Sequence, residues 1–163
     1  MPDDLYHRDF VLWSTDQAEK LRRLSQGEQV NDIDWPNVVT EVADLGKTET
    51  REVRSLLVRA LEHLLRVIAF PTAPDLRGWL HEADIFLRDA KLAWFPGMDQ
   101  LIDLPELYTF ACETVRGLEY REGPAKALPP DCPVTLRDLL PKEKREFGRA
   151  QVLIEKFHTP TQE

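Results

Sequence analysis

Between Asp34 and Phe70, apolar residues recur at intervals of three or four, which is the spacing of one face of an α-helix. Asp34 is a suitable N-cap, and Pro36 falls in the first turn, where a missing backbone N–H costs little. The pattern keeps one phase through Gly46 and forms a single stripe of Val38, Val42, Leu45, Val53, Leu56, Ala60, Leu64, Val67 and Phe70. The sequence therefore predicts one helix of roughly 35 residues.

Such a helix is long for a chain of 163 residues. At 1.5 Å per residue it measures about 52 Å, whereas a compact domain of this size has a diameter of roughly 40 Å. The helix must therefore bend or break near Leu45-Gly46-Lys47, or project and need a partner to cover it. Because a break would normally reset the phase of the stripe, we expect the helix to continue through Gly46 with a bend.

Prolines divide the rest of the chain into segments that also have helical periodicity, and there is almost no alternation typical of β-strands. Thr135 and Asp138 have the spacing of a capping box, which predicts a short helix after the proline-rich loop 125–134. We expect the other helices at about Asp9–Leu24, Asp75–Trp94, Pro105 to Gly123-Pro124, and Lys142–Phe157. The predicted fold is all-α, a single domain over residues 1–163 with a bundle of four or five main helices. In it, the second and third helices form an antiparallel hairpin around Pro71 and Pro74.

The charge of the chain argues against several kinds of partner. Its 21 Lys and Arg against 29 Asp and Glu give a net charge of −8, which opposes binding to nucleic acid or to an anionic membrane. The N-terminus is acidic where a signal peptide is basic, and no apolar run is long enough to span a membrane. Cys112 and Cys132 are too few for a disulfide framework or a four-thiolate zinc site. We therefore expect an acidic, cytoplasmic protein with both cysteines as thiols.

Several short motifs, taken together, carry a resemblance to a known family. They are Asp9-Phe10 with Trp13, Gln17 and Leu21, then Asp34-Trp35-Pro36-Asn37-Val38, Glu41-Val42, Leu45-Gly46-Lys47-Thr48-Glu49, Glu62-His63-Leu64-Leu65, Trp79, and Asp131-Cys132-Pro133-Val134-Thr135-Leu136 with Leu139-Leu140. On these residues the chain resembles a family of bacterial proteins, common in cyanobacteria and proteobacteria, that is catalogued as domain of unknown function twenty-nine. The resemblance covers residues 5–140, and the remainder, 141–163, has the character of a C-terminal helical extension.

The resemblance implies a helical bacterial protein with no established activity, and it supplies no catalytic residues for this chain. The sequence departs from the family pattern at two places. Thr40 stands where members tend to have a second glutamate beside the one that Glu41 matches. The stretch His81-Glu82-Ala83-Asp84 replaces a more basic one.

Two polar residues, Glu49 and His63, fall on the apolar stripe of the long helix. In one interpretation they join Glu41 in a polar pocket between helices, which could bind a metal. In the other, Glu49 is capped or faces water near a helix break at Gly46, and His63 is a core histidine satisfied by one hydrogen bond. We favour the second, since metal sites in helical bundles normally show a Glu-x-x-His pair on one helix and this helix has none.

Other polar patterns favour structural roles. His81 and Asp84 lie outside the apolar stripe of their helix and are expected at the surface. Cys112 has no histidine beside it and is expected to be a small buried thiol. A solvated face with ion pairs is predicted from arginines that alternate with glutamates along the long helix, namely Arg51, Arg54, Arg59 and Arg66. No phosphate-binding loop, nucleophile elbow or zinc motif occurs in the sequence, so we expect no metal or cofactor and name no catalytic residue.

Four residues are expected to have structural roles: Trp13, Trp35, Gly46 and Trp79. Trp35 follows an N-cap directly, and we expect it to fold back over the start of its helix. For function we prefer a non-enzymatic interaction or accessory protein that acts through a helix surface, as a homo-oligomer or with a protein partner. The reason is that the long helix exceeds what its own domain can cover. The alternative is a small helical enzyme or metal-binding protein with a pocket around Glu41, Glu49 and His63.

Overall fold

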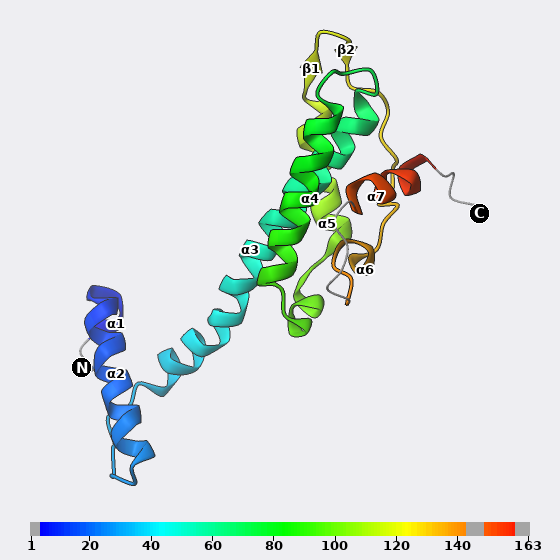
Figure 1. Ribbon diagram of the computed structural model, residues 1–163. Coiled ribbons are helices and arrows are strands. Elements are labelled where there is room, and N and C mark those ends of the chain that lie inside the picture. Colours follow the sequence, from blue (N-terminus) through cyan, green and yellow to red (C-terminus); the bar gives the residue numbers. More distant parts are fainter. Residues whose placement is uncertain (1–3, 143–148, 159–163) are drawn as a thin grey trace. The chain divides into compact units, whose positions relative to one another are not determined.

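The structure is a computed structural model that describes residues 4–142 and 149–158 (Figure 1). Its helices are α1 (Leu5–Arg8), α2 (Phe10–Ser25), α3 (Trp35–Ala69), α4 (Leu76–Ala93), the 3-10 helix η1 (Pro96–Leu101), α5 (Leu104–Arg116), α6 (Leu136–Leu139) and α7 (Arg149–His158). Two short antiparallel strands, β1 (Glu119–Tyr120) and β2 (Gly123–Pro124), lie between α5 and α6. The predicted all-α fold with four or five main helices is therefore confirmed. The chain divides into two compact units, Met1–Gly46 and Lys47–Glu163.

The long helix predicted from the sequence is continuous. α3 runs through Gly46, which does not have the positive φ of a helix cap. A Cβ built on Gly46 would have no atom within 4 Å apart from the helix's own neighbouring backbone. The prediction that the helix continues at this position is confirmed.

The N-terminal unit is an antiparallel helical hairpin made by α2 and the start of α3. Asp9 caps α2 by accepting a hydrogen bond from the backbone N–H of Leu12 at 2.9 Å. The other end of α2 has the Schellman arrangement, in which Gly27 N–H donates to the Leu24 carbonyl and Glu28 N–H to the Arg23 carbonyl. The φ of +88° at Gly27 suits a residue without a Cβ. This cap turns the chain back toward α3.

In the C-terminal unit, the second half of α3 packs antiparallel to α4, as predicted. Phe70 lies against Trp79 with 6.3 Å between ring centroids, and Arg59, eleven residues earlier on α3, lies 5.7 Å from the ring centroid of Phe86. Residue numbers thus fall along α3 as they rise along α4. Trp79 is buried, which agrees with its predicted structural role.

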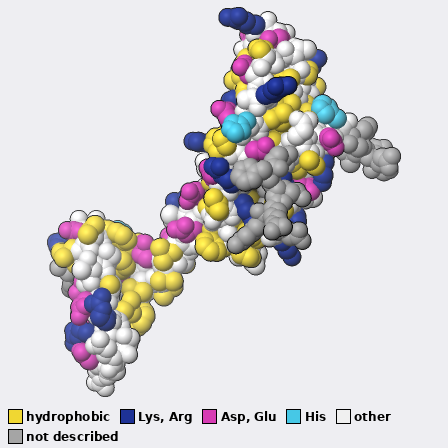
Figure 2. All heavy atoms as spheres, viewed as in Figure 1, with side chains coloured by type: hydrophobic (Ala, Val, Ile, Leu, Met, Phe, Trp, Pro, Cys, Tyr) yellow, Lys and Arg dark blue, Asp and Glu magenta, His cyan; other side chains and the backbone are white. Residues whose placement is uncertain are grey.

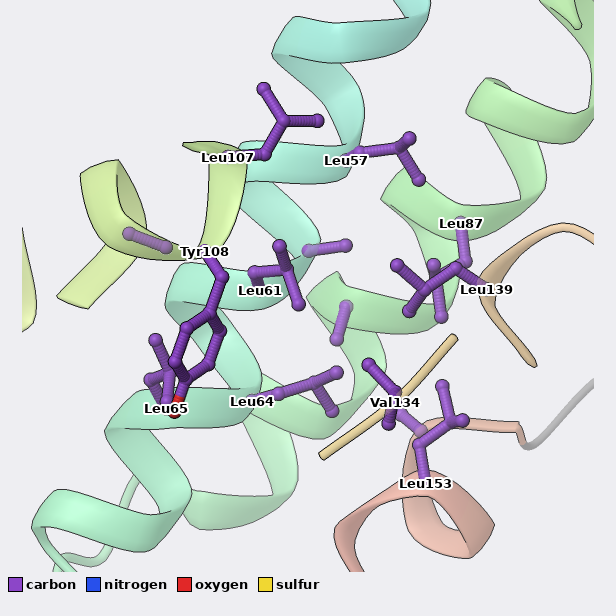
Figure 3. Packing of buried hydrophobic residues seen from close by; sticks show 14 of the residues in the cluster. Leu57, Leu61, Leu64, Leu65, Leu87, Leu107, Tyr108, Val134, Leu139 and Leu153 are labelled. Atoms are coloured by element: carbon purple, nitrogen blue, oxygen red, sulfur yellow. The ribbon is translucent and has the colours of Figure 1, made fainter. Parts of the chain in front are cut away.

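The hydrophobic core of the C-terminal unit lies between the second half of α3, α4 and α5, and the chain after β2 covers it (Figure 3). Its largest fully buried side chains include Leu57, Leu61, Leu64, Leu65, Leu107, Leu139 and Leu153. α7 is joined to α4 by a hydrogen bond from Ala150 N–H to the Asp84 carboxylate at 2.8 Å. The capping box before α6 is confirmed, because Thr135 and Asp138 exchange side-chain and backbone hydrogen bonds.

Two boundaries differ from the sequence prediction. α5 ends at Arg116, before the predicted Gly123-Pro124, and the chain then forms the β1–β2 turn with φ of +109° at Gly123. The Tyr120 ring holds this turn against the core. Its centroid lies 4.5 Å from that of Phe70 and 5.3 Å from that of Trp79. α7 begins at Arg149, and the part of the predicted last helix from 143 to 148 lies outside the described residues. Within the described residues, no helix combines the length and apolar content needed to cross a membrane.

Candidate interaction surface

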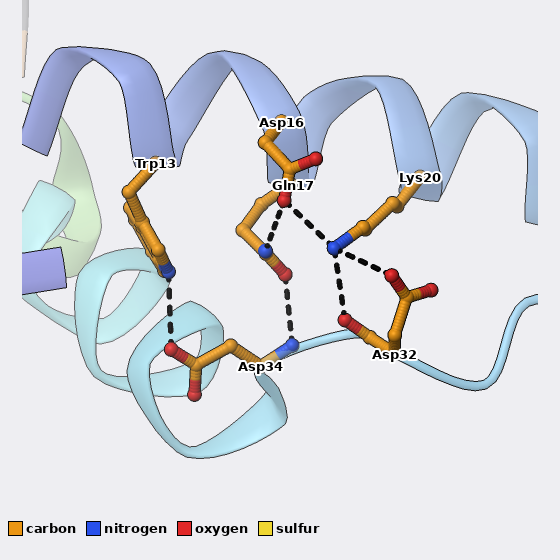
Figure 4. Close-up of polar contacts among 6 residues, drawn as sticks. All are labelled: Trp13, Asp16, Gln17, Lys20, Asp32 and Asp34. Atoms are coloured by element: carbon orange, nitrogen blue, oxygen red, sulfur yellow. Dashed lines mark hydrogen bonds and ion pairs between the residues drawn. The ribbon is translucent and has the colours of Figure 1, made fainter. Parts of the chain in front are cut away.

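Trp13 and Gln17 join α2 to the start of α3 through Asp34 (Figure 4). The Trp13 indole N–H donates to the Asp34 carboxylate at 3.0 Å, and the Asp34 backbone N–H donates to the Gln17 amide oxygen at 2.8 Å. Both α2 side chains are buried, so the predicted structural role of Trp13 is supported. A hydrogen bond from the Asn37 amide and the indole of Trp13 lower the pKa of Asp34.

Lys20 fixes the loop that precedes α3. Its ammonium group lies 2.7 Å from the Asp16 carboxylate and 2.8 Å from that of Asp32, and it also donates to the Asp32 carbonyl oxygen (Figure 4). The hydrogen bonds to Asp16 and Asp32 raise the pKa of Lys20, and the pKa of Asp32 is lowered by its bond to Lys20. The polar contacts of the hairpin therefore link α2, the loop and α3.

Tyr6 adds an aromatic contact at the open end of the hairpin. Its hydroxyl donates to the Glu41 carboxylate on α3 at 2.5 Å, and this bond raises the pKa of the phenol. The Tyr6 ring packs edge-on against Trp13 at 4.9 Å, and Phe10 stacks on Trp13 at 5.5 Å. Glu41 is thereby held on the side of α3 that faces α1 and α2.

The apolar stripe of α3 is buried in the second half of the helix and largely exposed in the first half. Val53, Leu57 and Ala60 are completely buried in the C-terminal unit. In the N-terminal unit, on the same side of the helix, Val42 and Leu45 are each 64% exposed and Val39 is 62% exposed. These exposed side chains, together with Val38 and Gly46, form what we call the α3 face. None of its residues is charged, and the exposed Glu49 follows on the same stripe one turn after Leu45.

Trp35 departs from its expected role. Half of its surface, 51%, is exposed, whereas a ring packed over the helix start would be largely covered. The reason is its place on the helix: Trp35 lies about two turns before Val42 on the same side, and the hairpin places α2 against a different side of α3. A tryptophan in this position enlarges the exposed apolar surface beside the α3 face.

More exposed apolar side chains occur on the first turn of α2, namely Phe10, Val11 and Leu12. Figure 2 shows hydrophobic side chains gathered over much of the visible surface of the N-terminal unit. In the C-terminal unit the large exposed apolar residues are spread over α4, η1, α5, α7 and the chain between them: Leu92, Phe95, Leu101, Phe110 and Val152. Among the described residues, the N-terminal unit therefore has the more concentrated apolar surface for its size.

The residues of the candidate polar pocket have separate neighbours. Glu41, in the N-terminal unit, accepts the Tyr6 hydrogen bond. Glu49 is exposed, which fits the interpretation that it faces water. Among the described residues, no group of three or more His, Cys, Asp or Glu side chains is arranged to hold a metal ion.

His63 is a buried histidine with both ring nitrogens engaged. Nδ1 lies 2.8 Å from the Arg59 carbonyl oxygen and Nε2 lies 2.5 Å from a carboxylate oxygen of Glu82 on α4. The Phe86 ring packs beside the imidazole with 5.3 Å between centroids. These contacts match the predicted core histidine, whereas the partner Glu82 was not predicted, because sequence spacing does not show which α4 residue faces α3.

The other polar residues considered in the sequence analysis, His81, Asp84 and the cysteines, fit structural roles. His81 is exposed, as predicted, and Asp84 is partly buried because it accepts the bond from Ala150 N–H. Burial raises the pKa of both free thiols, Cys112 and Cys132, which disfavours the nucleophilic thiolate. The local sequence gave no signal for the contact between Asp84 and Ala150, since the two residues are 66 positions apart.

Comparisons with known proteins agree with the observed fold. The sequence profile of "Domain of unknown function DUF29" matches residues 5–144. The crystal structure of an alpha-helical protein of unknown function from Rhodospirillum rubrum, at 1.45 Å resolution, is similar with a TM-score of 0.65. That similarity covers 93% of this chain and 96% of the other at 22% sequence identity, and it therefore concerns the fold alone. No curated protein matches the sequence.

Proposed function

Because the chain belongs to the DUF29 family, whose description assigns no activity, we propose its function from its surface: it binds other protein chains through the α3 face. In this proposal the protein is a non-enzymatic interaction or accessory protein. The C-terminal unit supplies a packed helical core, and the N-terminal hairpin presents the apolar surface.

The observation that carries the proposal is the change in burial along one stripe of one helix. Val53 and Leu57 are fully buried, whereas Val42 and Leu45 are 64% exposed. Burying an apolar side chain of this size contributes about 1.5–3 kcal/mol relative to leaving it exposed. Contiguous exposed apolar surface of this kind typically marks sites of protein–protein interaction. The charge-free α3 face therefore suits an apolar protein surface better than a charged ligand.

Photo-crosslinking in the cells from which the gene comes tests this function. A photoreactive benzoylphenylalanine replaces Val39 or Val42 on the α3 face, and Thr40 in the control variant. Thr40 is also exposed, but it lies about 160° around the helix from Val42. We expect adducts of higher mass from positions 39 and 42 but not from position 40. Absent adducts, or equal adducts from all three positions, would overturn the proposed function.

A further inference from the structure

The N-terminal hairpin buries few of its own side chains. Within its described residues, 4–46, only Trp13, Gln17 and Ile33 are buried. A helical hairpin with so small a core gains little stability by itself. In four-helix bundles, two such hairpins bury their apolar sides against each other. The question is therefore which chain supplies the covering helices.

The α3 face has nearly the same pattern read in either direction from Val42. At 100° per residue, Val39 and Leu45 lie about 60° to either side of Val42, one turn before and after it. Val38 and Gly46 likewise lie about 40° to either side. A surface that is symmetric about one residue can pack against an identical copy of itself in the antiparallel direction, since a two-fold interface places the same patch on both partners.

Gly46 lies where such a pairing needs a small residue. In an antiparallel pair centred on Val42, Val39 of one copy lies opposite Gly46 of the other, and Val38 lies opposite Leu45. A Cβ on Gly46 would meet no atom within 4 Å outside its own helix, so space for a facing side chain is open there. Glycine in a helix interior costs about 1 kcal/mol relative to alanine. The close approach of a second helix at Gly46 would offset this cost.

The α3 face itself offers no charge to a basic partner. Residues 1–46 contain 10 Asp and Glu and 4 Lys and Arg, a net charge of −6, yet none of these charges lies on the α3 face. Between positions 35 and 46 the acidic residues are Glu41 and Asp44, and both lie to the same side of Val42. A basic amphipathic helix would be matched by acidic residues along both edges. The uncharged face instead matches another uncharged face.

We propose that two copies of this chain pair through their α3 faces, antiparallel, with Val42 at the two-fold axis. The pairing brings two N-terminal hairpins together, so that each covers the apolar surface of the other. This inference rests on the proposed function, because it names a second copy of the chain as the protein bound at the α3 face.

Disulfide crosslinking of full-length variants tests the geometry. Val42→Cys should give a covalent dimer under mild oxidation, whereas Thr40→Cys and the unaltered chain with its two native thiols should not. Val38→Cys and Leu45→Cys should crosslink more efficiently when mixed than either does alone, since antiparallel pairing places these two positions opposite each other. Preferential crosslinking of each variant with itself would indicate a parallel pair and overturn the proposal.

Light scattering tests the association itself. At tens of micromolar we expect a mass of 37.8 kDa, which is twice the 18.9 kDa of one chain, and 18.9 kDa for Val42→Glu. The Thr40→Glu variant should keep the dimeric mass, and circular dichroism should show unchanged helix content in both variants. A mass of 18.9 kDa for the unaltered chain would overturn the dimer. If photo-crosslinking then still gave adducts with other proteins, the proposed function would stand without the dimer.

Discussion

Trp13 and Trp35 belong to the same hairpin but have opposite surroundings. Trp13 is 5% exposed and donates a hydrogen bond to Asp34, whereas Trp35 is 51% exposed. The residue type alone therefore does not show whether a tryptophan has a structural role or binds a partner. The difference is how far the hairpin covers each ring: Trp13 is buried between α2 and the start of α3, whereas half of Trp35 stays exposed.

We expect Trp13→Ala to destabilise the hairpin by about 3–5 kcal/mol, the usual cost of removing a buried aromatic side chain. Trp35→Ala in dilute protein should cost less than about 1 kcal/mol, because its ring is half exposed. Native-state hydrogen exchange of the α2 amides gives the free energy of opening in each variant. Similar losses for both variants would contradict the assigned surroundings.

Asp34 makes the hairpin sensitive to acid. Its pKa lies below the ordinary 3.8, mainly because of the hydrogen bond from Asn37, with a further contribution from Trp13, while burial opposes the shift. A carboxylate with a lowered pKa in the folded state contributes stability above its unfolded pKa, and this stability is lost as the pH falls through the folded value. The hairpin should therefore keep this contribution above pH 3.8 and lose it in stronger acid.

Asp34→Asn should remove that part of the acid sensitivity. We expect the variant to be less stable than the unaltered chain near neutral pH, and the difference should shrink as the pH falls below 3.8. Thermal unfolding followed by circular dichroism at a series of pH values measures this difference in stability. A stability difference that stays constant across that range would show that the charge of Asp34 contributes nothing.

At the scale of the element, two glycines of the N-terminal unit should respond oppositely to the same substitution. Gly27 has φ of +88° in the cap of α2, and alanine in that conformation costs about 1–2 kcal/mol. Gly46 lies inside α3 in open space, so Gly46→Ala should gain up to about 1 kcal/mol in dilute, unpaired protein. Denaturation followed by circular dichroism compares the two, and a loss at Gly46 would indicate a close contact already present within one chain.

The start of α7 depends on a residue of α4. The Asp84 carboxylate accepts a hydrogen bond from Ala150 N–H, as an N-cap residue does from within its own chain segment. Asp84→Ala should weaken the docking of α7 by about 0.5–2 kcal/mol, and Asp84→Asn should weaken it less because an acceptor oxygen remains. Faster hydrogen exchange in α7 of Asp84→Ala is the expected readout. Equal hydrogen-exchange rates in α7 of the unaltered chain, Asp84→Ala and Asp84→Asn would contradict this capping role.

The helices could be predicted because their signals are local. Asp9, Thr135 and Gly27 act on residues only a few positions away, and the periodic stripe of α3 identified one continuous helix. The β1–β2 turn was missed because two residues per strand give no alternation to detect. Its position depends on Tyr120 packing against Phe70, a contact across 50 positions.

The candidate surface was predictable only in part. Periodicity located the apolar stripe, and the length of the helix led to the hypothesis that the helix either bends or projects and needs a partner to cover it. The sequence could not show at which residue the stripe changes from buried to exposed, because the residues that cover Val53 and Leu57 come from helices distant in the sequence. For the same reason the exposure of Trp35 and the contact of His63 with Glu82 required the structure.

At the scale of the whole molecule, the net charge of −8 should act against self-association. Pairing brings together two units of net charge −6 and places the two copies of Glu41 on the same side of the interface. Added salt screens this repulsion, so the dimer should become tighter between about 0.01 M and 0.15 M ionic strength. Sedimentation equilibrium measures the dissociation constant at each salt concentration. Weaker association with rising salt would instead indicate that opposite charges hold the two chains together.

The exposure of Trp35 gives the chain an optical signal of its own. An indole in water emits at longer wavelength than one in an apolar environment, and of the four tryptophans Trp13 and Trp79 are already buried. A protein that covers the surface near the start of α3 should shift the emission to the blue and protect Trp35 from collisional quenching. Acrylamide is the suitable quencher, since iodide is repelled by the acidic hairpin. Occupation of this surface can therefore be followed in the unlabelled protein.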